Sequence, residues 1–142
     1  MTAPANATPW VQQQLKKIDA AGGDTSVVDV MGLPIVVVTM TGAKSSQPRR
    51  VPLMRVEHDG NYAAVGSKGG DAKDPVWVNN IKADPHVTVL DGTQSHTLRS
   101  REITGDERAQ WWDRCVAAYP PYAEYQTKTD RLIPVFLLEP TS

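Results

Sequence analysis

The sequence predicts a mainly β fold with α-helices (α+β), in which six to seven short, mostly antiparallel strands form a barrel with peripheral helices. Short runs of β-branched and apolar residues recur along the chain and are separated by turn signals such as Asp-Gly, which are typical of hairpins. Helical periodicity is confined to a few segments between those runs. The regular alternation of strand and helix that a Rossmann sheet requires is missing from the sequence.

The length fits one domain. A chain of 142 residues should bury roughly two thirds of its unfolded surface. Its contents of 40% hydrophobic and 22% charged residues are those of an ordinary globular protein. We therefore expect a single barrel domain over residues 1–142, with residues 1–24 as an N-terminal tail and helix.

Charge, cysteine content and the N-terminal sequence narrow the class of protein. A net charge of −1 argues against a nucleic-acid binder, and the single cysteine excludes an internal disulfide framework. The first residues have neither the basic nor the apolar region of a signal peptide, and no apolar run approaches the roughly 20 residues of a spanning helix. We expect a cytoplasmic protein that is at most peripheral to a membrane.

The first helix should follow Thr8 as cap and Pro9 at the first helical position, and end at Gly22-Gly23. Its apolar stripe is narrow, with Leu15 and Ile18 at its centre. Packing against the barrel is the simpler interpretation. The alternative is peripheral contact of this helix with a membrane surface or a partner.

Seven runs are expected as strands, and tight turns join most of them. Asp59-Gly60 and Asp91-Gly92 are the clearest of these turns. In chain order the expected strands are Ser26–Val30, Ile35–Thr41, Arg50–Glu57, Asn61–Gly66, Val87–Leu90, Gln94–Ile103 and Ile133–Glu139.

Two more helices are expected between the strands. Asp74 should cap a short helix with Pro75 in its first turn, which runs to about Ala83 before Asp84-Pro85. Thr104-x-x-Glu107 has the spacing of a capping box and should open a helix from about Gly105 to Ala118.

The common catalytic and metal-binding patterns do not occur. His58, His86 and His96 lack metal-ligand spacing, and Cys115 lies within a helix, where a packed core thiol is expected. The run Gly42-Ala43-Lys44-Ser45 does not match a phosphate loop, which requires a glycine before the lysine. We expect no metal site.

The segment from Lys44 to Lys82 is locally basic, with seven cations against four acids and hence a charge of +3. Three of the cations share the loop TGAKSSQPRR, and glycines near Lys68 would let backbone N–H groups approach an anion. An elongated polyanion could lie along this surface. A solvated loop with scattered cations is the alternative.

Aromatic residues cluster near the C-terminus. Five of the nine fall in one short segment: Trp111, Trp112, Tyr119, Tyr122 and Tyr125. Tyrosine rings can form the wall of a pocket for a flat apolar ligand while their hydroxyls act as hydrogen-bond donors. Trp77 would then lie at the floor of the same pocket. Coverage of a core edge is the alternative.

Three segments in order carry a family resemblance: TGAKSSQPRRVPLMRVEHDG, GSKGGDAKDPVWVNNIKADPHV and WWDRCVAAYPPYAEYQTKTDRLIPVFLLEP. From about Leu33 to Pro140 the chain resembles the deazaflavin (coenzyme F420)-dependent nitroreductase family of actinobacteria. The resemblance implies a split β-barrel that binds coenzyme F420, whose phosphate and oligoglutamate tail form an elongated polyanion. It implies hydride transfer from the reduced 8-hydroxy-5-deazaflavin to an electron-poor quinone, activated enone or nitroaromatic.

The resemblance also implies the site residues. Those expected to bind the cofactor are Lys44, Ser45, Arg49, Arg50, Pro52, Leu53, Met54, Val65, Gly66, Ser67, Lys68, Gly69, Trp77, Asn80 and Lys82. Those expected around the substrate are Met54, Tyr119, Tyr122 and Tyr125. Ser67 and Tyr122 are the candidate catalytic hydroxyls, with solvent as the alternative proton source.

Met54 stands where the best-known nitroreductase of the family has a tyrosine, which weakens the expectation of nitroimidazole activation but not of cofactor binding. Two other functions remain open at this stage. One is an FMN-dependent split-barrel oxidoreductase, which the cationic loop disfavours because FMN has no glutamate tail. The other is a non-catalytic deazaflavin-binding protein, for which a tyrosine wall would have no use. The oligomeric state is not predicted.

Overall fold

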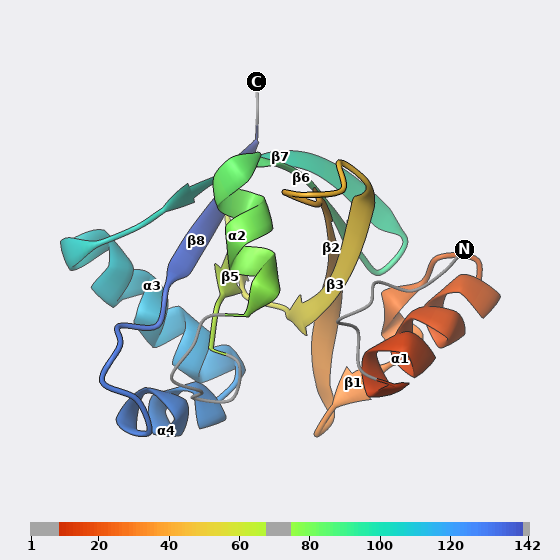
Figure 1. The fold of residues 1–142 in the computed structure, drawn as a ribbon. Helices are drawn as coiled ribbons and strands as arrows, with labels where there is room; N and C mark the ends of the chain where they lie inside the picture. The colour runs from red at the N-terminus through yellow and green to blue at the C-terminus, as the bar shows by residue number, and fades with distance from the viewer. Residues whose placement is uncertain (1–8, 68–74, 141–142) are drawn as a thin grey trace.

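The computed structural model describes residues 9–67 and 75–140, which form a curled antiparallel sheet with helices around it (Figure 1). Within these residues the sheet has eight strands in the order β1-β2-β6-β7-β8-β5-β4, and β3 pairs with β2. The strands are β1 (Asp29–Val30), β2 (Leu33–Thr41), β3 (Pro48–Met54), β4 (Glu57–His58), β5 (Asn61–Val65), β6 (His86–Asp91), β7 (Gln94–Glu102) and β8 (Val135–Pro140). Every pairing is antiparallel, as the hairpin signals predicted.

Both faces of the sheet are buried, and each faces its own core. Along β2, Ile35 and Val37 point into one hydrophobic cluster and Val36 and Val38 into the other, because successive side chains of a strand alternate between faces. The same alternation occurs along β5 and β8. The near-continuous apolar runs of these strands therefore reflect burial on both sides.

The helices divide between the two cores. They are α1 (Pro9–Ala20), α2 (Val76–Ala83), α3 (Gly105–Ala118) and α4 (Pro121–Thr127), with a short 3-10 helix η1 (Thr25–Val27). α2 lies across the opening of the curled sheet, between β5 and β8 on one side and β2 and β3 on the other, and contributes Trp77, Val78 and Ile81 to the inner core (Figure 1). α1, α3 and α4 cover the outer face.

Most predicted elements are confirmed, including the first helix, whose apolar residues Leu15 and Ile18 are buried in the outer core. The Asp59-Gly60 turn has positive φ angles of 54° and 84°, the backbone that a type I′ hairpin requires. The expected cap residues Thr8 and Asp74 lie outside the described residues.

Two strand predictions were wrong in extent. Residues 26–30 do not form one strand, because Asp24 accepts hydrogen bonds from the backbone N–H and the hydroxyl of Ser26 and thereby caps the 3-10 turn η1, leaving only β1 extended. The strand expected over Arg50–Glu57 starts earlier and ends at Met54, and the chain re-enters the sheet as β4. β4 is the one strand beyond the seven expected runs, so the described sheet has eight strands.

The helices after β7 also differ from expectation. Thr104 precedes α3, but its side chain makes no capping hydrogen bond, and Glu107 instead pairs with Arg101 at 2.7 Å, so the capping-box prediction was wrong. The segment that holds Tyr122 and Tyr125, for which no helix was expected, forms α4. Pro121 lies at its start, where a missing backbone N–H has no cost.

A polar cluster connects strands that share no ladder. The Nε atom of Arg55 lies 2.9 Å from Oδ2 of Asp91, and the Tyr62 hydroxyl donates to the same oxygen at 2.7 Å. Arg55 follows β3, Tyr62 lies on β5 and Asp91 ends β6, so the cluster spans the open side of the barrel. We call these three residues the Arg55–Tyr62–Asp91 clasp.

We expect Asp91→Ala to lower the free energy of unfolding by about 2 kcal/mol, since hydrogen bonds to a charged group are lost and the half-buried guanidinium of Arg55 keeps only the more distant Glu57, at 3.8 Å. Urea unfolding measures the change. Asp113→Ala, at an exposed position of α3, is the matched control and should change the value by less than about 0.5 kcal/mol. If the two substitutions lowered the free energy of unfolding equally, the clasp would not stabilise the fold.

The same clasp predicts a pH dependence. Burial and the hydrogen bond to Asp91 raise the pKa of Tyr62 to about 12, whereas the phenol of an unfolded chain ionises near its ordinary value of 10.0. The stabilisation is therefore complete below pH 10 and is lost as the pH rises towards 12. The difference in unfolding free energy between the wild type and Tyr62→Phe should shrink from pH 9 to pH 11. A difference that stays constant would contradict the assignment.

Candidate functional site

A pocket of about 300 Å³ opens where α1, the end of β3, the end of β5 and α4 meet. It brings together residues from both expected groups. Its lining consists of Gln14, Val30, Ile35, Val51, Pro52, Leu53, Met54, Val65, Ser67, Pro75, Trp77, Tyr119, Tyr122 and Tyr125. A mostly apolar cavity with a few hydroxyls is the usual form of a site for a small organic molecule.

One wall of the pocket is the end of β3 together with Trp77 of α2. Pro52, Leu53 and Met54 lie along this strand, whose ladder with β2 fixes their positions. Trp77 is 7% exposed and packs edge-on against Phe136, with 6.0 Å between the ring centroids. Strand pairing and ring packing therefore hold this wall in place.

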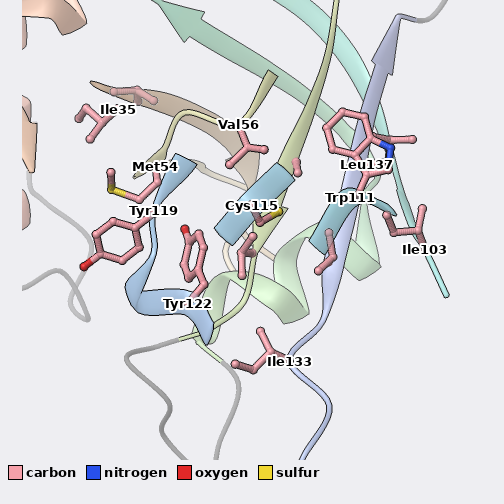
Figure 2. Close-up of a cluster of buried hydrophobic side chains, with 14 of the residues drawn as sticks. Ile35, Met54, Val56, Ile103, Trp111, Cys115, Tyr119, Tyr122, Ile133 and Leu137 are labelled. Carbon is pink, nitrogen blue, oxygen red and sulfur yellow. The ribbon is translucent and has the colours of Figure 1, made fainter. Parts of the chain in front are cut away.

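The facing wall is formed by tyrosines of α4 and of the turn before it. Tyr119 and Tyr122 stand edge to face with 4.9 Å between the ring centroids, and Figure 2 shows both beside Met54. The hydroxyl oxygens of Tyr119 and Tyr125 lie 3.0 Å apart and share a hydrogen bond, which with burial raises the pKa of Tyr125 to about 12. These two hydroxyls are thus partnered with each other.

Tyr122 differs from its neighbours. Its side chain is 4% exposed, and its hydroxyl has no hydrogen-bond partner within residues 9–67 and 75–140. Burial raises the pKa of Tyr122 far above its ordinary value, so the phenol stays protonated across the physiological range. A neutral phenol with an unused O–H is available to donate a hydrogen bond to a bound ligand.

Ser67 brings a second hydroxyl to the pocket from the end of β5. Its carbonyl oxygen accepts a hydrogen bond of 2.8 Å from Nη2 of Arg131, which fixes the backbone there. The preceding Gly66 is required by close packing, since a Cβ at this position would lie 2.8 Å from Cγ of Pro134. Lys68 and Gly69, also expected near the cofactor, lie outside the described residues.

Gln126 connects α4 to the segment that leads into β8. Its Nε2 donates to the carbonyl of Arg131 at 2.8 Å, and its Oε1 accepts from the backbone N–H of Ile133 at 3.0 Å. Through Arg131 this connection continues to Ser67. The two expected catalytic hydroxyls, on Ser67 and Tyr122, therefore belong to segments that are joined by hydrogen bonds.

The cationic loop lies at the far end of β3 from the tyrosines. Lys44 is exposed, and neither Lys44 nor Arg49 pairs with a carboxylate of the described chain; Arg49 donates to the Ser45 hydroxyl at 2.9 Å. The backbone N–H of Ala43 donates to Oδ1 of Asn80 at 2.9 Å, which ties the loop to α2. Two cations without carboxylate partners in the described chain thus lie at the loop that contacts α2, the helix that carries Trp77.

Two other expected cofactor ligands already have acidic partners. Arg50 makes a bidentate ion pair with Asp19 of α1 at 2.7 and 3.0 Å, and this hydrogen bonding lowers the pKa of Asp19. Lys82 lies 3.9 Å from Glu102. Arg50 therefore fastens α1 to β3, and Lys44 and Arg49 are the better candidates for an anion.

Sequence reasoning missed five lining residues: Gln14, Val30, Ile35, Val51 and Pro75. Four are apolar or proline and carry no functional signal. Gln14 is polar and lies on the buried face of α1 beside Leu15, a position at which its neighbours alone would have predicted an apolar residue.

The cysteine and the histidines, for which the sequence predicted no catalytic or metal-binding role, lie outside the pocket lining. Burial raises the pKa of the Cys115 thiol to about 12, and Figure 2 shows this residue inside the outer core. His58 and His86 pair with the neighbouring Asp59 and Asp84 on the surface. Among the described residues no group of His, Cys, Asp and Glu side chains could hold a metal ion, and no helix has the length and apolarity to cross a membrane.

Comparisons with known proteins agree with this geometry. A family model described as F420H(2)-dependent quinone reductase matches residues 10–140. The chain is 33% identical over 108 residues to the F420H(2)-dependent quinone reductase Rv1261c of Mycobacterium tuberculosis, across 74% of this chain and 72% of that protein.

Solved structures match as well. An F420-H2 dependent reductase, FDR-A, is 59% identical with a TM-score of 0.73 and covers 79% of this chain and 99% of its own. A second structure, described as a domain-swapped dimer, is 56% identical with a TM-score of 0.75 over 92% of this chain and 97% of its own. The split-barrel fold expected from the resemblance is therefore confirmed.

Proposed function

The chain belongs to the F420H(2)-dependent quinone reductase family, and from this premise we propose that it transfers a hydride from reduced coenzyme F420 to a quinone bound against the tyrosine wall. The family makes the chain an F420-dependent oxidoreductase, and coenzyme F420 its cofactor. The observation that carries the finer proposal is that the end of β3 lines the same pocket as Tyr119 and Tyr122.

The residues present fit the cofactor. Pro52, Leu53 and Trp77 would lie against the deazaflavin, and Val65 and Ser67 would border it. The cofactor also has a phosphate and a glutamate tail, for which Lys44 and Arg49 offer cations without carboxylate partners in the described chain. Arg50 and Lys82 would contribute only by leaving Asp19 and Glu102.

When bound and reduced, the deazaflavin supplies the hydride, so the chain has to orient the acceptor, exclude water and provide a proton. The Tyr122 hydroxyl is suited to hydrogen-bond an acceptor oxygen on which negative charge develops, because it is unpartnered and remains neutral. Ser67, on the opposite edge, can hold a water molecule or a second oxygen. Reduction consumes one hydride and one proton per quinone, and the proton comes from solvent through these hydroxyls.

Activated enones and nitroaromatics are also electron-poor and flat, and we keep them within the proposed acceptor range. The described structure gives the N-terminal helix no free apolar stripe for a membrane, since Leu15 and Ile18 are buried in the outer core. We propose that the enzyme acts on small molecules in the cytoplasm.

A panel of acceptors tests the proposed substrate class. Purified protein and reduced F420 are mixed with menadione, cyclohexenone or a nitroimidazole, and the return of F420 absorbance is followed. We expect menadione to be reduced fastest, and the nitroimidazole slowest because Met54 offers no hydroxyl beside the pocket. Faster reduction of the nitroimidazole or the enone than of menadione would contradict a quinone as the preferred acceptor.

A further inference from the structure

Gln14 of α1 lines the pocket, and its side-chain amide oxygen makes no hydrogen bond to the described residues. Its side chain is 6% exposed, and its Oε1 has no hydrogen-bond partner in the described chain. A buried amide oxygen without a partner destabilises a folded protein, because it loses water and gains nothing in exchange. Such a group in the lining of a pocket suggests that a ligand supplies the missing hydrogen-bond donor, as the hydroxyl of a quinol can.

The packing of α1 places Gln14 on the acceptor side of the pocket. The adjacent Leu15 belongs to the same hydrophobic cluster as Met54, Tyr119 and Tyr122, the residues expected around the substrate. Trp77, expected against the deazaflavin, belongs to the other cluster. The helix that carries Gln14 is held in place by the Arg50–Asp19 ion pair.

We infer that the Gln14 carboxamide is a specificity-determining group that hydrogen-bonds one oxygen of the quinone acceptor. This inference rests on the proposed function. A carboxamide has both a donor and an acceptor, and its terminal torsion turns readily. Its N–H can donate to a quinone carbonyl before reduction, and its Oε1 can accept from the hydroxyl of the quinol afterwards. With Tyr122 at the other wall, a flat ring with two opposed oxygens is held at both ends.

The test uses a matched pair of substitutions, Gln14→Met and Gln13→Met. Gln13 is the exposed neighbour on the same helix and lines only a second cavity of about 240 Å³, whereas Gln14 lines both that cavity and the pocket. Gln14→Met should raise the KM for menadione about 3- to 10-fold, the effect of one lost hydrogen bond, with kcat little changed and F420 affinity intact. Gln13→Met should leave all three values at wild-type levels.

A second readout does not depend on turnover. Without cofactor, menadione should raise the melting temperature of the wild type and of Gln13→Met more than that of Gln14→Met. The free Gln14→Met protein should be at least as stable as the wild type, since it buries no unpartnered amide. If Met packs poorly, Gln14→Leu provides the same comparison.

The outcomes separate this inference from the proposed function. Wild-type protein that binds menadione without reducing it would overturn the proposed reaction, and the melting shifts would still decide the role of Gln14. Normal turnover with an unchanged KM and melting shift in Gln14→Met would overturn the role of Gln14 alone. A loss of F420 affinity in this variant would also overturn it, by placing Gln14 against the cofactor.

Discussion

Replacing Lys44 and Arg49 together with alanine should weaken F420 binding at least about tenfold at low ionic strength, because each charge-assisted contact to an anionic tail contributes about 1.5–3 kcal/mol when fully formed. Both side chains lack a carboxylate partner in the described structure, so neither has to break an ion pair to meet the tail. Quenching of F420 fluorescence measures the dissociation constant.

Salt dependence and a matched control sharpen this prediction. The affinity lost in Lys44→Ala/Arg49→Ala should shrink as salt is raised, because screening weakens exposed charges in the wild type first. The control is Lys16→Ala/Arg99→Ala, at exposed positions of α1 and β7. It lowers the net charge as much as Lys44→Ala/Arg49→Ala does, but outside the cationic loop. A similar loss in this control would reduce the effect to overall charge and refute a tail site at the loop.

Tyr122→Phe should lower kcat/KM for quinone reduction about 10- to 100-fold, since one donor to a developing oxyanion is lost from a site of low polarity. F420 affinity should stay within about twofold, because the ring and its packing remain. Stopped-flow measurement of F420 oxidation at saturating cofactor gives the rate of the hydride step.

The control for Tyr122 removes a hydroxyl elsewhere. Tyr62→Phe deletes a buried phenol oxygen of the clasp, outside the pocket lining, and should lower stability while leaving quinone reduction unchanged. If Tyr122→Phe instead abolished cofactor binding, Tyr122 would belong to the deazaflavin side of the pocket.

The fold was predictable where local chemistry determines the backbone. Asp59-Gly60 requires a tight turn, and β-branched runs such as Ile35–Val38 form strands in most contexts. The wrong secondary-structure predictions arose where one residue is compatible with two backbone conformations. The Asp24 carboxylate curls residues 25–27 into a 3-10 turn, and Pro121 starts a helix although a proline within a sequence usually indicates a break.

Residues that the family resemblance names along β3 and α4 line one pocket, and their roles stay predictions. The site was not predictable where partners are distant in sequence. Nothing near Arg50 indicates that Asp19 would neutralise it, because only the docking of α1 on β3 brings the two charges together. Gln14 was missed because a glutamine on the apolar face of a helix carries no signal of a pocket, and only the docking of α1 shows that it lines one.

The most direct test of the central claim compares two reduced cofactors under single turnover. Protein is mixed anaerobically with menadione and either reduced F420 or reduced FMN, each beside a blank without protein. We expect the protein to accelerate oxidation of reduced F420 well above its blank and to leave the FMN reaction at the rate of its blank. No acceleration with F420, or an equal acceleration with FMN, would contradict it.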